Sequence, residues 1–160
     1  MLMLTFEVGT ERFAIAAAAV VEIVPAVKLR PIPLAEPWAA GVFDYRGHIT
    51  PVIDLCQVFR HQPCAACMST RIMVVQHTAA DGAERPLGLM AERMTRMVDL
   101  DRERFQDAGV TVDAAACLGD LGHDEHGLLQ WVDHHRLLPA EVAERLFRRA
   151  AEQTAAEAWG

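Results

Sequence analysis

The residues of this sequence that could bind a metal ion or carry out redox chemistry lie within one stretch of twelve positions. Cys56, His61, Cys64 and Cys67 offer three thiolates and one imidazole, enough ligands to close a tetrahedral zinc shell. Their spacing matches no common zinc module, and a loop with incidental cysteines explains them more simply. Cys64 and Cys67 also form a C-x-x-C pair, but the strand and helix of a thioredoxin-type site are missing around it. A metal- or redox-dependent sensor is kept as the second hypothesis, and the first hypothesis includes no metal.

The histidines and the remaining motifs give little support to catalysis. The turn at 123–126 and the pair His134-His135 place imidazoles near carboxylates, but no nucleophile or pocket signature accompanies them. We therefore interpret these histidines as residues of surface turns. The sequence also contains no nucleophile elbow, phosphate-binding loop or dinucleotide fingerprint. We expect a protein that is not an enzyme and that uses no cofactor.

One arginine on a predicted turn is a candidate for binding a partner protein. Residues 41–55 (GVFDYRGHITPVIDL) place the tetrapeptide Asp44-Tyr45-Arg46-Gly47 between two apolar runs. The chain can reverse there because Gly47 tolerates a positive φ. A turn on a rigid scaffold would present the five donors of Arg46 to a carboxylate or carbonyl of a partner. The alternative, which the sequence leaves open, is that Arg46 pairs with Asp44 or Asp54 at the surface.

Composition and charge narrow the class of protein. The chain has 160 residues, of which 52% are hydrophobic, enough for one compact domain. Its net charge is −7, and no basic run with interleaved aromatic residues occurs, so we expect no nucleic-acid binding. No apolar run approaches the ~20 residues that span a bilayer, and residues 1–6 lack the basic region of a signal peptide. Four cysteines are few for a chain of this length, so we expect reduced thiols. Together with the lack of apolar and signal segments, this indicates a cytoplasmic location and no insertion into a membrane.

The elements that would position these residues are mostly short strands. Alternating or β-branched runs predict strands near 1–8, 12–15, 20–24, 49–53, 70–77, 86–90, 94–100, 118–122 and 127–132. Asp54 is expected to cap a short helix over 55–59, and Pro37 to open another over 36–40. Many short strands without long alternating helices favour barrels over a doubly wound sheet.

A longer helix is predicted at the C-terminal end. Pro139 can occupy a first helical turn, and Val142, Leu146 and Ala150 form an apolar stripe beside Phe147. We expect residues 1–153 to form a single domain and residues 154–160 to be a frayed tail.

Several motifs carry a resemblance to a known family. They are Phe6-x-x-Gly9-x-x-x-Phe13-x-Ile15, Val20-x-Glu22-Ile23, Leu87-Gly88-Leu89, Leu128-Leu129, Leu137-Leu138 and, as the most specific, Gly41-Val42-x-x-x-Arg46-Gly47-x-Ile49-x-Pro51-Val52-Ile53-Asp54-Leu55. With their order along the chain they resemble the CheW-like family of chemotaxis coupling proteins. The resemblance covers residues from about 3 to about 147, which is essentially the whole chain.

The resemblance implies a fold, a function and a set of contact residues. The fold would be mainly β, with two small five-stranded SH3-like β-barrels packed together, short helices and a C-terminal helix. The function would be that of an adaptor without an active site, which joins the regulatory domain of a CheA-type histidine kinase to the signalling tips of methyl-accepting chemoreceptors. By their motif positions, Val20, Glu22, Arg46 and Gly47 would face these partners. A phospho-acceptor or receiver segment is missing, which separates the chain from the kinase and from CheV-type adaptors.

The chain departs from the family pattern at one important position. Asp44 stands where the family usually has Asn, which places a negative charge two residues before Arg46. Tyr45, Ser69-Thr70-Arg71 and Gln130-Trp131 are similar to the CheW-like adaptors of Wsp-type surface-sensing systems. Those systems feed a diguanylate cyclase, which makes cyclic-di-GMP, instead of a flagellar motor. The sequence leaves open which of the two outputs this chain serves.

Overall fold

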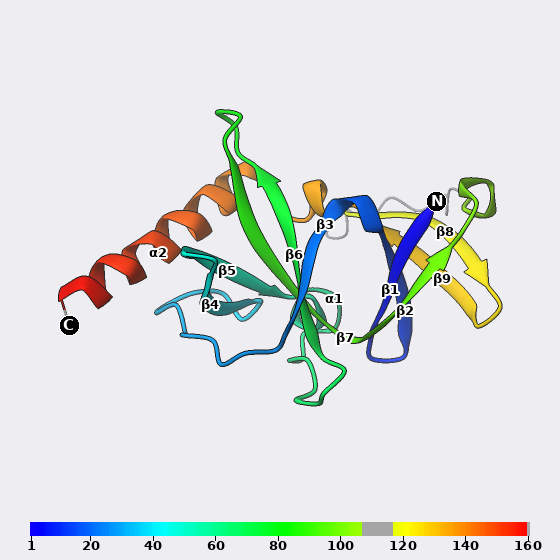
Figure 1. The fold of residues 1–160 in the computed structure, drawn as a ribbon, viewed down its shortest axis with the longest axis horizontal. Coiled ribbons are helices and arrows are strands. Elements are labelled where there is room, and N and C mark those ends of the chain that lie inside the picture. The colour runs from blue at the N-terminus through cyan, green and yellow to red at the C-terminus, as the bar shows by residue number, and fades with distance from the viewer. Residues whose placement is uncertain (107–116, 160) are drawn as a thin grey trace.

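The computed structural model describes residues 1–106 and 117–159, apart from the side chains of Thr95 and 154–159. Within these ranges the fold is mainly β, as predicted, with one short helix and one long C-terminal helix (Figure 1). The elements are β1 (Leu2–Val8), β2 (Glu11–Ala16), η1 (Ala17–Ala19), β3 (Val20–Pro25), β4 (Ala39–Tyr45), β5 (His48–Asp54), α1 (Leu55–Arg60), β6 (Arg71–Thr78), β7 (Glu84–Asp99), η2 (Arg102–Arg104), β8 (Leu118–Asp124), β9 (Gly127–Val132), η4 (His134–Arg136) and α2 (Ala140–Trp159).

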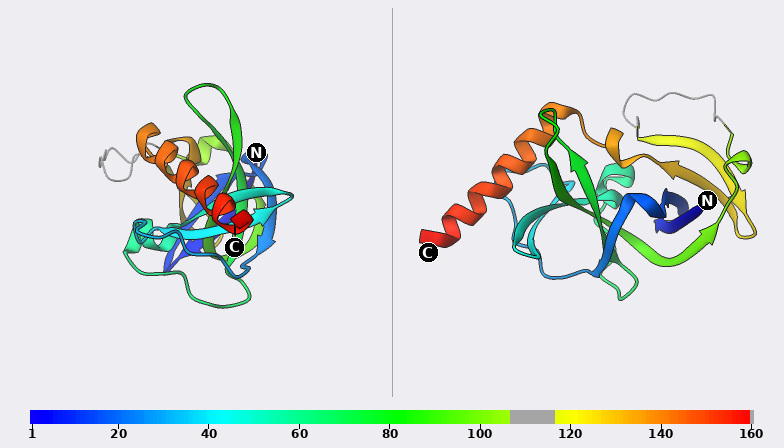
Figure 2. Two further views of the ribbon diagram at one scale, coloured as in Figure 1. Left: turned by 90° about the vertical axis from the view of Figure 1, so that its left-hand side faces the viewer. Right: turned by 45° about the horizontal axis from the view of Figure 1, so that its top comes forward.

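The strands form two halves that share β7. In one half β7 pairs with β1, β1 with β2, β2 with β9 and β9 with β8. In the other half β7 pairs with β6 and β5, β6 pairs with β3, and β5 pairs with β4. Figure 2 shows the long β7 running from one half into the other. Among the described residues, each half therefore contains five strands when β7 is counted in both.

The prediction of two separate strands at 86–90 and 94–100 is wrong, because both belong to β7. Residues 84–91 pair with β6, whereas Glu92 and residues 96–99 pair with β1, with a register shift between these two pairings. Within this shift Arg93 has a φ of +46°, a left-handed value that is uncommon for a residue with a side chain. The strand thus changes its partner next to a backbone irregularity without being interrupted.

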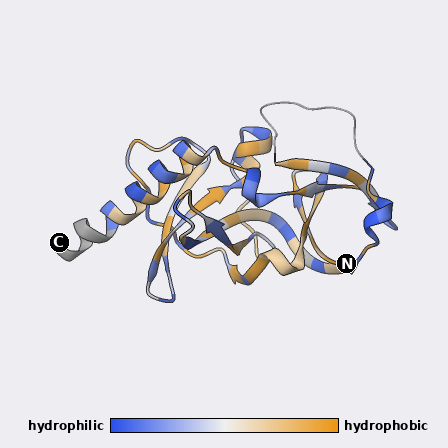
Figure 3. Ribbon diagram, turned by 90° about the horizontal axis from the view of Figure 1, so that it is seen from above, coloured by the Kyte–Doolittle hydropathy of each residue, from blue (hydrophilic) through white to orange (hydrophobic). Residues whose placement is uncertain are grey.

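A single main core extends through both halves. It includes Phe6 and Phe13 from the first half and Val75 and Leu89 from the second, all at most 2% exposed. The ring of Phe13 stacks between Phe6, 5.8 Å away, and Phe59 of α1, 5.0 Å away. A smaller cluster around Phe105 underlies the hairpin β8–β9. Figure 3 shows how hydrophobic and hydrophilic residues alternate along the elements that enclose these cores.

The helices follow their predicted start signals with one exception. Asp54 caps α1 by accepting hydrogen bonds from the backbone N–H groups of Cys56 (2.9 Å) and Gln57 (3.2 Å). Pro139 precedes α2, and its carbonyl accepts the N–H of Ala143 at 3.0 Å. The short helix expected over 36–40 is wrong, because Ala39 pairs with Ile53 at the start of β4. Strand pairing overrides the modest helix preference of two alanines there.

Candidate partner-binding surface

The hairpin between β4 and β5 ends in the predicted turn. Arg46 and Gly47 form its two-residue loop and have φ values of +50° and +85°. Two positive φ values give the turn a twist that matches the flanking strands. The carboxylate of Asp44 accepts the backbone N–H of Gly47 at 2.8 Å, which stabilises the turn. An Asn side-chain oxygen could accept the same bond, so the departure at Asp44 is compatible with this local geometry.

The carboxylate of Glu22 on β3 joins the hairpin to a different part of the chain. Its Oε2 lies 3.0 Å from Nη2 of Arg46 and accepts a hydrogen bond of 2.5 Å from the Tyr45 hydroxyl. The guanidinium of Arg46 also lies 5.5 Å from the centre of the Tyr45 ring. Arg46 thus pairs with Glu22 and not, as the alternative from the sequence had it, with Asp44 or Asp54. We call Glu22, Tyr45 and Arg46 the hairpin cluster.

The hairpin cluster has a buried side and an open side. Tyr45 is only 8% exposed, and its hydrogen bond to Glu22 raises the pKa of the phenol. The side chain of Arg46, by contrast, is 72% exposed and that of Glu22 is 36% exposed. An Arg held at one edge by an ion pair keeps further donors for a second carboxylate or a carbonyl. A Cβ added at Gly47 would meet no atom within 4 Å, so the tip of the turn is open.

The other predicted contact residue, Val20, begins β3. It is half-buried and packs against the main core, whereas Val21 beside it is 51% exposed. The register of β3 against β6 shifts between Val20 and Glu22, so these two residues do not follow the regular alternation of a strand. In the described sheet β3 pairs with β6 on one side and occupies the end of the strand order. Exposed Val21 and half-buried Glu22 thus lie on an edge strand, and Glu22 contacts the hairpin.

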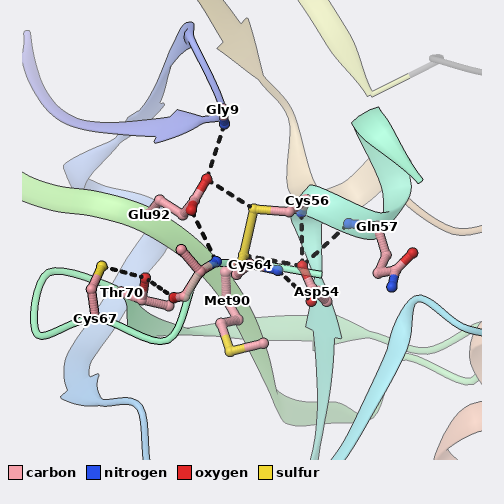
Figure 4. Close-up of a disulfide and its surroundings, with 10 residues drawn as sticks. Gly9, Asp54, Cys56, Gln57, Cys64, Cys67, Thr70, Met90 and Glu92 are labelled. Atoms are coloured by element: carbon pink, nitrogen blue, oxygen red, sulfur yellow. Dashed lines mark hydrogen bonds between the residues drawn. A yellow bond between two sulfur atoms is a disulfide. The ribbon is translucent and has the colours of Figure 1, made fainter. Parts of the chain in front are cut away.

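The predicted cysteine cluster is only partly brought together (Figure 4). Cys56 and Cys64 form a disulfide with a Cα–Cα distance of 5.2 Å, so the expectation of reduced thiols is wrong for this pair. Among the described residues, one group of possible metal ligands lies close together: the donor atoms of Asp54, Cys56 and Cys64 are all within 4.8 Å of one another. His61 and Cys67 do not join this group; His61 instead ends α1 with a φ of +58°. The proposed four-residue zinc shell is therefore not assembled.

Sequence reasoning also missed a polar concavity between β1, β2 and β7. Its volume is about 480 Å³, and Arg12, Arg93, Arg96 and His126 contribute to its wall. Arg12 binds the carboxylate of Asp124 through two hydrogen bonds of 2.7 and 2.8 Å. This interaction lowers the pKa of Asp124 to about 2 and joins β2 to β8. No short sequence motif predicts this pair, because its two residues are 112 positions apart.

Comparison with known proteins agrees with this architecture. A family model described as CheW-like domain matches residues 2–142. The chain is 26% identical over 146 residues to a chemotaxis protein CheW of Treponema pallidum, covering 90% of this chain and 85% of that protein. It is 24% identical over 144 residues to a chemotaxis protein CheW of Bacillus subtilis, covering 89% of each. The crystal structure of the scaffolding protein TtCheW from Thermoanaerobacter tengcongensis superposes with a TM-score of 0.75 and 22% identity, over 86% of this chain and 87% of that one.

The match of the family model over residues 2–142 assigns the chain to a class of signalling scaffold. The chain belongs to the CheW-like family, and it is a non-enzymatic coupling protein of chemotaxis signalling. In the part of the chain that the structure describes, no helix is both long and apolar enough to cross a membrane.

Proposed function

We propose that this chain couples the regulatory domain of a CheA-type histidine kinase to the signalling tips of methyl-accepting chemoreceptors. The observation that carries the proposal is the exposed Arg46 guanidinium, held on a two-residue turn and anchored at one edge by Glu22. A charged group fixed in this way loses little side-chain freedom when a partner binds. Val20, Glu22, Arg46 and Gly47 are the contact residues of this proposal. The partners are proteins, and the net charge of −7 argues against nucleic acid.

The architecture behind the proposal is a single domain over residues 1–153, built from two SH3-like barrels. The support is that each half contains five strands and that both halves share β7 and the main core. Two isolated bridges, Arg30 with Val42 and Gln106 with Leu121, extend the pairing at β4 and at β8. We place the protein in the cytoplasm, where kinase and receptor tips would meet it.

A second part of the proposal concerns the output of the signalling pathway. Tyr45, which completes the hairpin cluster, is one of the residues similar to Wsp-type adaptors. We therefore favour a surface-sensing pathway with a cyclic-di-GMP output over a flagellar motor. The neighbouring coding context tests this choice: a response regulator with a diguanylate cyclase domain is expected nearby. A neighbourhood of flagellar motor genes without such a regulator would contradict it.

The coupling function is tested by reconstitution from purified components. The chain is mixed with the kinase regulatory domain and with a soluble receptor signalling fragment, and complexes are separated by size-exclusion chromatography. We expect each partner to bind alone and both to bind together. Failure of the folded chain to bind either partner would contradict the proposal.

A charge swap then separates the internal ion pair from the contact with a partner. The double variant Glu22→Arg/Arg46→Glu can rebuild the internal pair, but it reverses the charges that a partner meets. The swap also removes the acceptor of the Tyr45 hydroxyl, so we expect the double variant to fold with somewhat lower stability and to lose binding. Arg148→Ala, which removes an exposed guanidinium from α2, is the control and should bind as the wild type does. Full binding by the swapped variant would show that the pair has only an internal role.

A further inference from the structure

The disulfide between Cys56 and Cys64 lies between two carboxylates. It joins the first turn of α1 to the loop that follows this helix. Oδ1 of Asp54 lies 3.1 Å from the sulfur of Cys64, and Oε1 of Glu92 lies 3.6 Å from the sulfur of Cys56. Figure 4 shows one carboxylate on each side of the sulfur pair. Each sulfur atom therefore has its own oxygen neighbour.

Both carboxylates are held by backbone groups and not by the sulfur atoms. Asp54 accepts N–H groups from Cys56, Gln57 and Cys64, at 2.9 to 3.2 Å. Glu92 accepts those of Gly9 at 3.0 Å and Ala65 at 2.9 Å. These bonds can persist whether or not the two sulfur atoms are joined. The oxygens therefore stay in place for either state of the pair.

Reduction of the disulfide would produce two thiols, which are new hydrogen-bond donors in a buried place. Cys56 is 1% exposed, and a buried donor without an acceptor is costly. Here the Cys56 thiol can donate to Glu92 and the Cys64 thiol to Asp54, over the same sulfur–oxygen distances. The fold thus satisfies the dithiol as well as the disulfide. A purely structural disulfide does not require acceptors at both sulfur atoms.

We propose that Cys56–Cys64 is a reversible thiol-exchange site, opened by dithiol reductants and closed again by their disulfides. In the opening step, a thiolate of the reductant attacks the sulfur of Cys64, the less buried residue of the pair, and Cys56 leaves with the electron pair of the broken bond and takes up a proton. The second thiol of the reductant then attacks the mixed disulfide and releases Cys64. The protein gains two electrons and two protons, and the reductant becomes a disulfide. This inference does not depend on the proposed coupling function.

The loop that the disulfide restrains also borders a groove. Cys67 and Met68 of this loop face Ile23, Val24 and Pro25 across a groove of about 500 Å³. Opening the disulfide removes the covalent attachment of the loop to α1. We therefore expect greater mobility of the loop and of this wall of the groove in the reduced protein.

The two remaining cysteines differ in reactivity, and this difference decides the design of the test. Hydrogen bonds from Ser69 and Thr70 lower the pKa of the exposed Cys67 to about 7, so this thiol competes in exchange reactions. Burial raises the pKa of Cys117 to about 11, so this thiol reacts little in the folded protein. The variant Cys67→Ser removes the competitor and leaves the exchange site intact.

The test uses the full chain with Cys67→Ser, equilibrated under native conditions with dithiothreitol at set ratios of its reduced and oxidised forms. The samples are quenched with acid, alkylated with N-ethylmaleimide in denaturant, and their intact masses are measured. We expect species with one added alkyl group, on Cys117, and with three added groups to interconvert in both directions, while the melting transition of the native protein is retained. A bond that opens only after denaturant is added, or that never forms from the folded dithiol, would overturn the proposal.

A second variant tests the role of the carboxylates. The ultraviolet absorbance of the Cys56 thiolate is titrated in Cys64→Ser/Cys67→Ser protein, with and without Glu92→Gln. Removing the negative charge beside Cys56 should lower the pH of thiolate formation by about one unit or more. Glu84→Gln, an exposed glutamate at the start of β7, is the matched control. An unchanged titration with Glu92→Gln would contradict the assignment of Glu92 as the acceptor for Cys56.

Discussion

At the scale of single residues, the carboxylate of Glu22 serves two neighbours at once. It accepts the Tyr45 hydroxyl on its buried side and the Arg46 guanidinium on its exposed side. Neither Glu22 nor Arg46 is a fully buried charge, because both side chains are partly exposed to solvent. We therefore expect the fold to depend on the tyrosine contact more than on the arginine contact.

Replacing Tyr45 with Phe tests this difference. The variant keeps the ring in its place and removes the hydroxyl that donates to Glu22. A hydrogen bond to a charged group contributes about 1.5–3 kcal/mol, and exposure of Glu22 reduces this value, so a loss of about 1 kcal/mol is expected. Urea denaturation of the wild type and the variant measures it. Equal free energies of unfolding would show that this bond has no net effect.

The sequence predicted the turn but not the partner of its arginine. Gly47 and the two apolar runs indicate a reversal from local information alone. The pairing of Arg46 with Glu22 depends on β3 approaching the hairpin in space, although β6 and β7 separate β3 from β5 in the strand order. The disulfide escaped prediction for a related reason, since the spacing of four cysteines does not give their connectivity.

Two histidines near α2 make stability depend on pH. Burial lowers the pKa of His77, which stacks on Phe147 at 5.1 Å, and of His134, whose Nε2 lies 3.1 Å from the carbonyl of Gln76. The unfolded chain then binds more protons than the folded one. Their contribution is fully present above pH 6.5, the ordinary pKa, and is lost as the pH falls through the lowered values.

We therefore expect the free energy of unfolding to decrease between pH 7 and pH 5. The double variant His77→Gln/His134→Gln lacks these titrations, so its decrease over the same range should be smaller. Urea denaturation at both pH values gives the two slopes. If the variant and the wild type decline by the same amount, other groups cause the pH dependence.

At the scale of elements, one ion pair joins the hairpin β8–β9 to β2. The side chains of Arg12 and Asp124 are 17% and 5% exposed, and Arg12 lowers the pKa of Asp124 from 3.8 to about 2. Such a shift contributes about 2 kcal/mol above pH 4, and it is lost as the pH falls toward 2. Asp124→Asn should lower the free energy of unfolding at pH 7 by a similar amount. Glu125→Gln, in the same turn but exposed, should change it by less than about 0.5 kcal/mol.

The C-terminal helix gives a second test at this scale. Its predicted stripe is confirmed, since Leu146 and Phe147 are 5% and 8% exposed and pack against the main core. Phe147→Ala should cost about 3–5 kcal/mol, as expected for a buried Phe. Deleting residues 154–160, which we expect to fray, should hardly change the melting temperature. Similar effects of both changes in thermal melts would mean that the end of the folded domain lies further along the chain.

The long β7 shows a limit of predicting strands from local sequence patterns. The apolar patterns on either side of Arg93 were recognised, but their union in one strand was not. Local propensity does not report that a strand can change its partners halfway along its length. That information comes from the pairing of residues far apart in the sequence.

At the scale of the whole molecule, the two halves share β7 and the main core. The proposed contacts lie on one face, formed by β3 and the β4–β5 hairpin. This view predicts that the hairpin cluster can lose its exposed arginine with little effect on the fold. Stability and partner binding should therefore respond differently to the same substitution.

The most direct measurement is the affinity of Arg46→Ala for the kinase regulatory domain or the receptor tip, set beside its thermal melt. We predict a change in stability of no more than about 0.5 kcal/mol and a loss of binding free energy of about 1 kcal/mol or more. Arg148→Ala should change neither quantity. A destabilised Arg46→Ala protein that still binds both partners with the affinity of the wild type would contradict the assignment of Arg46 as a contact residue.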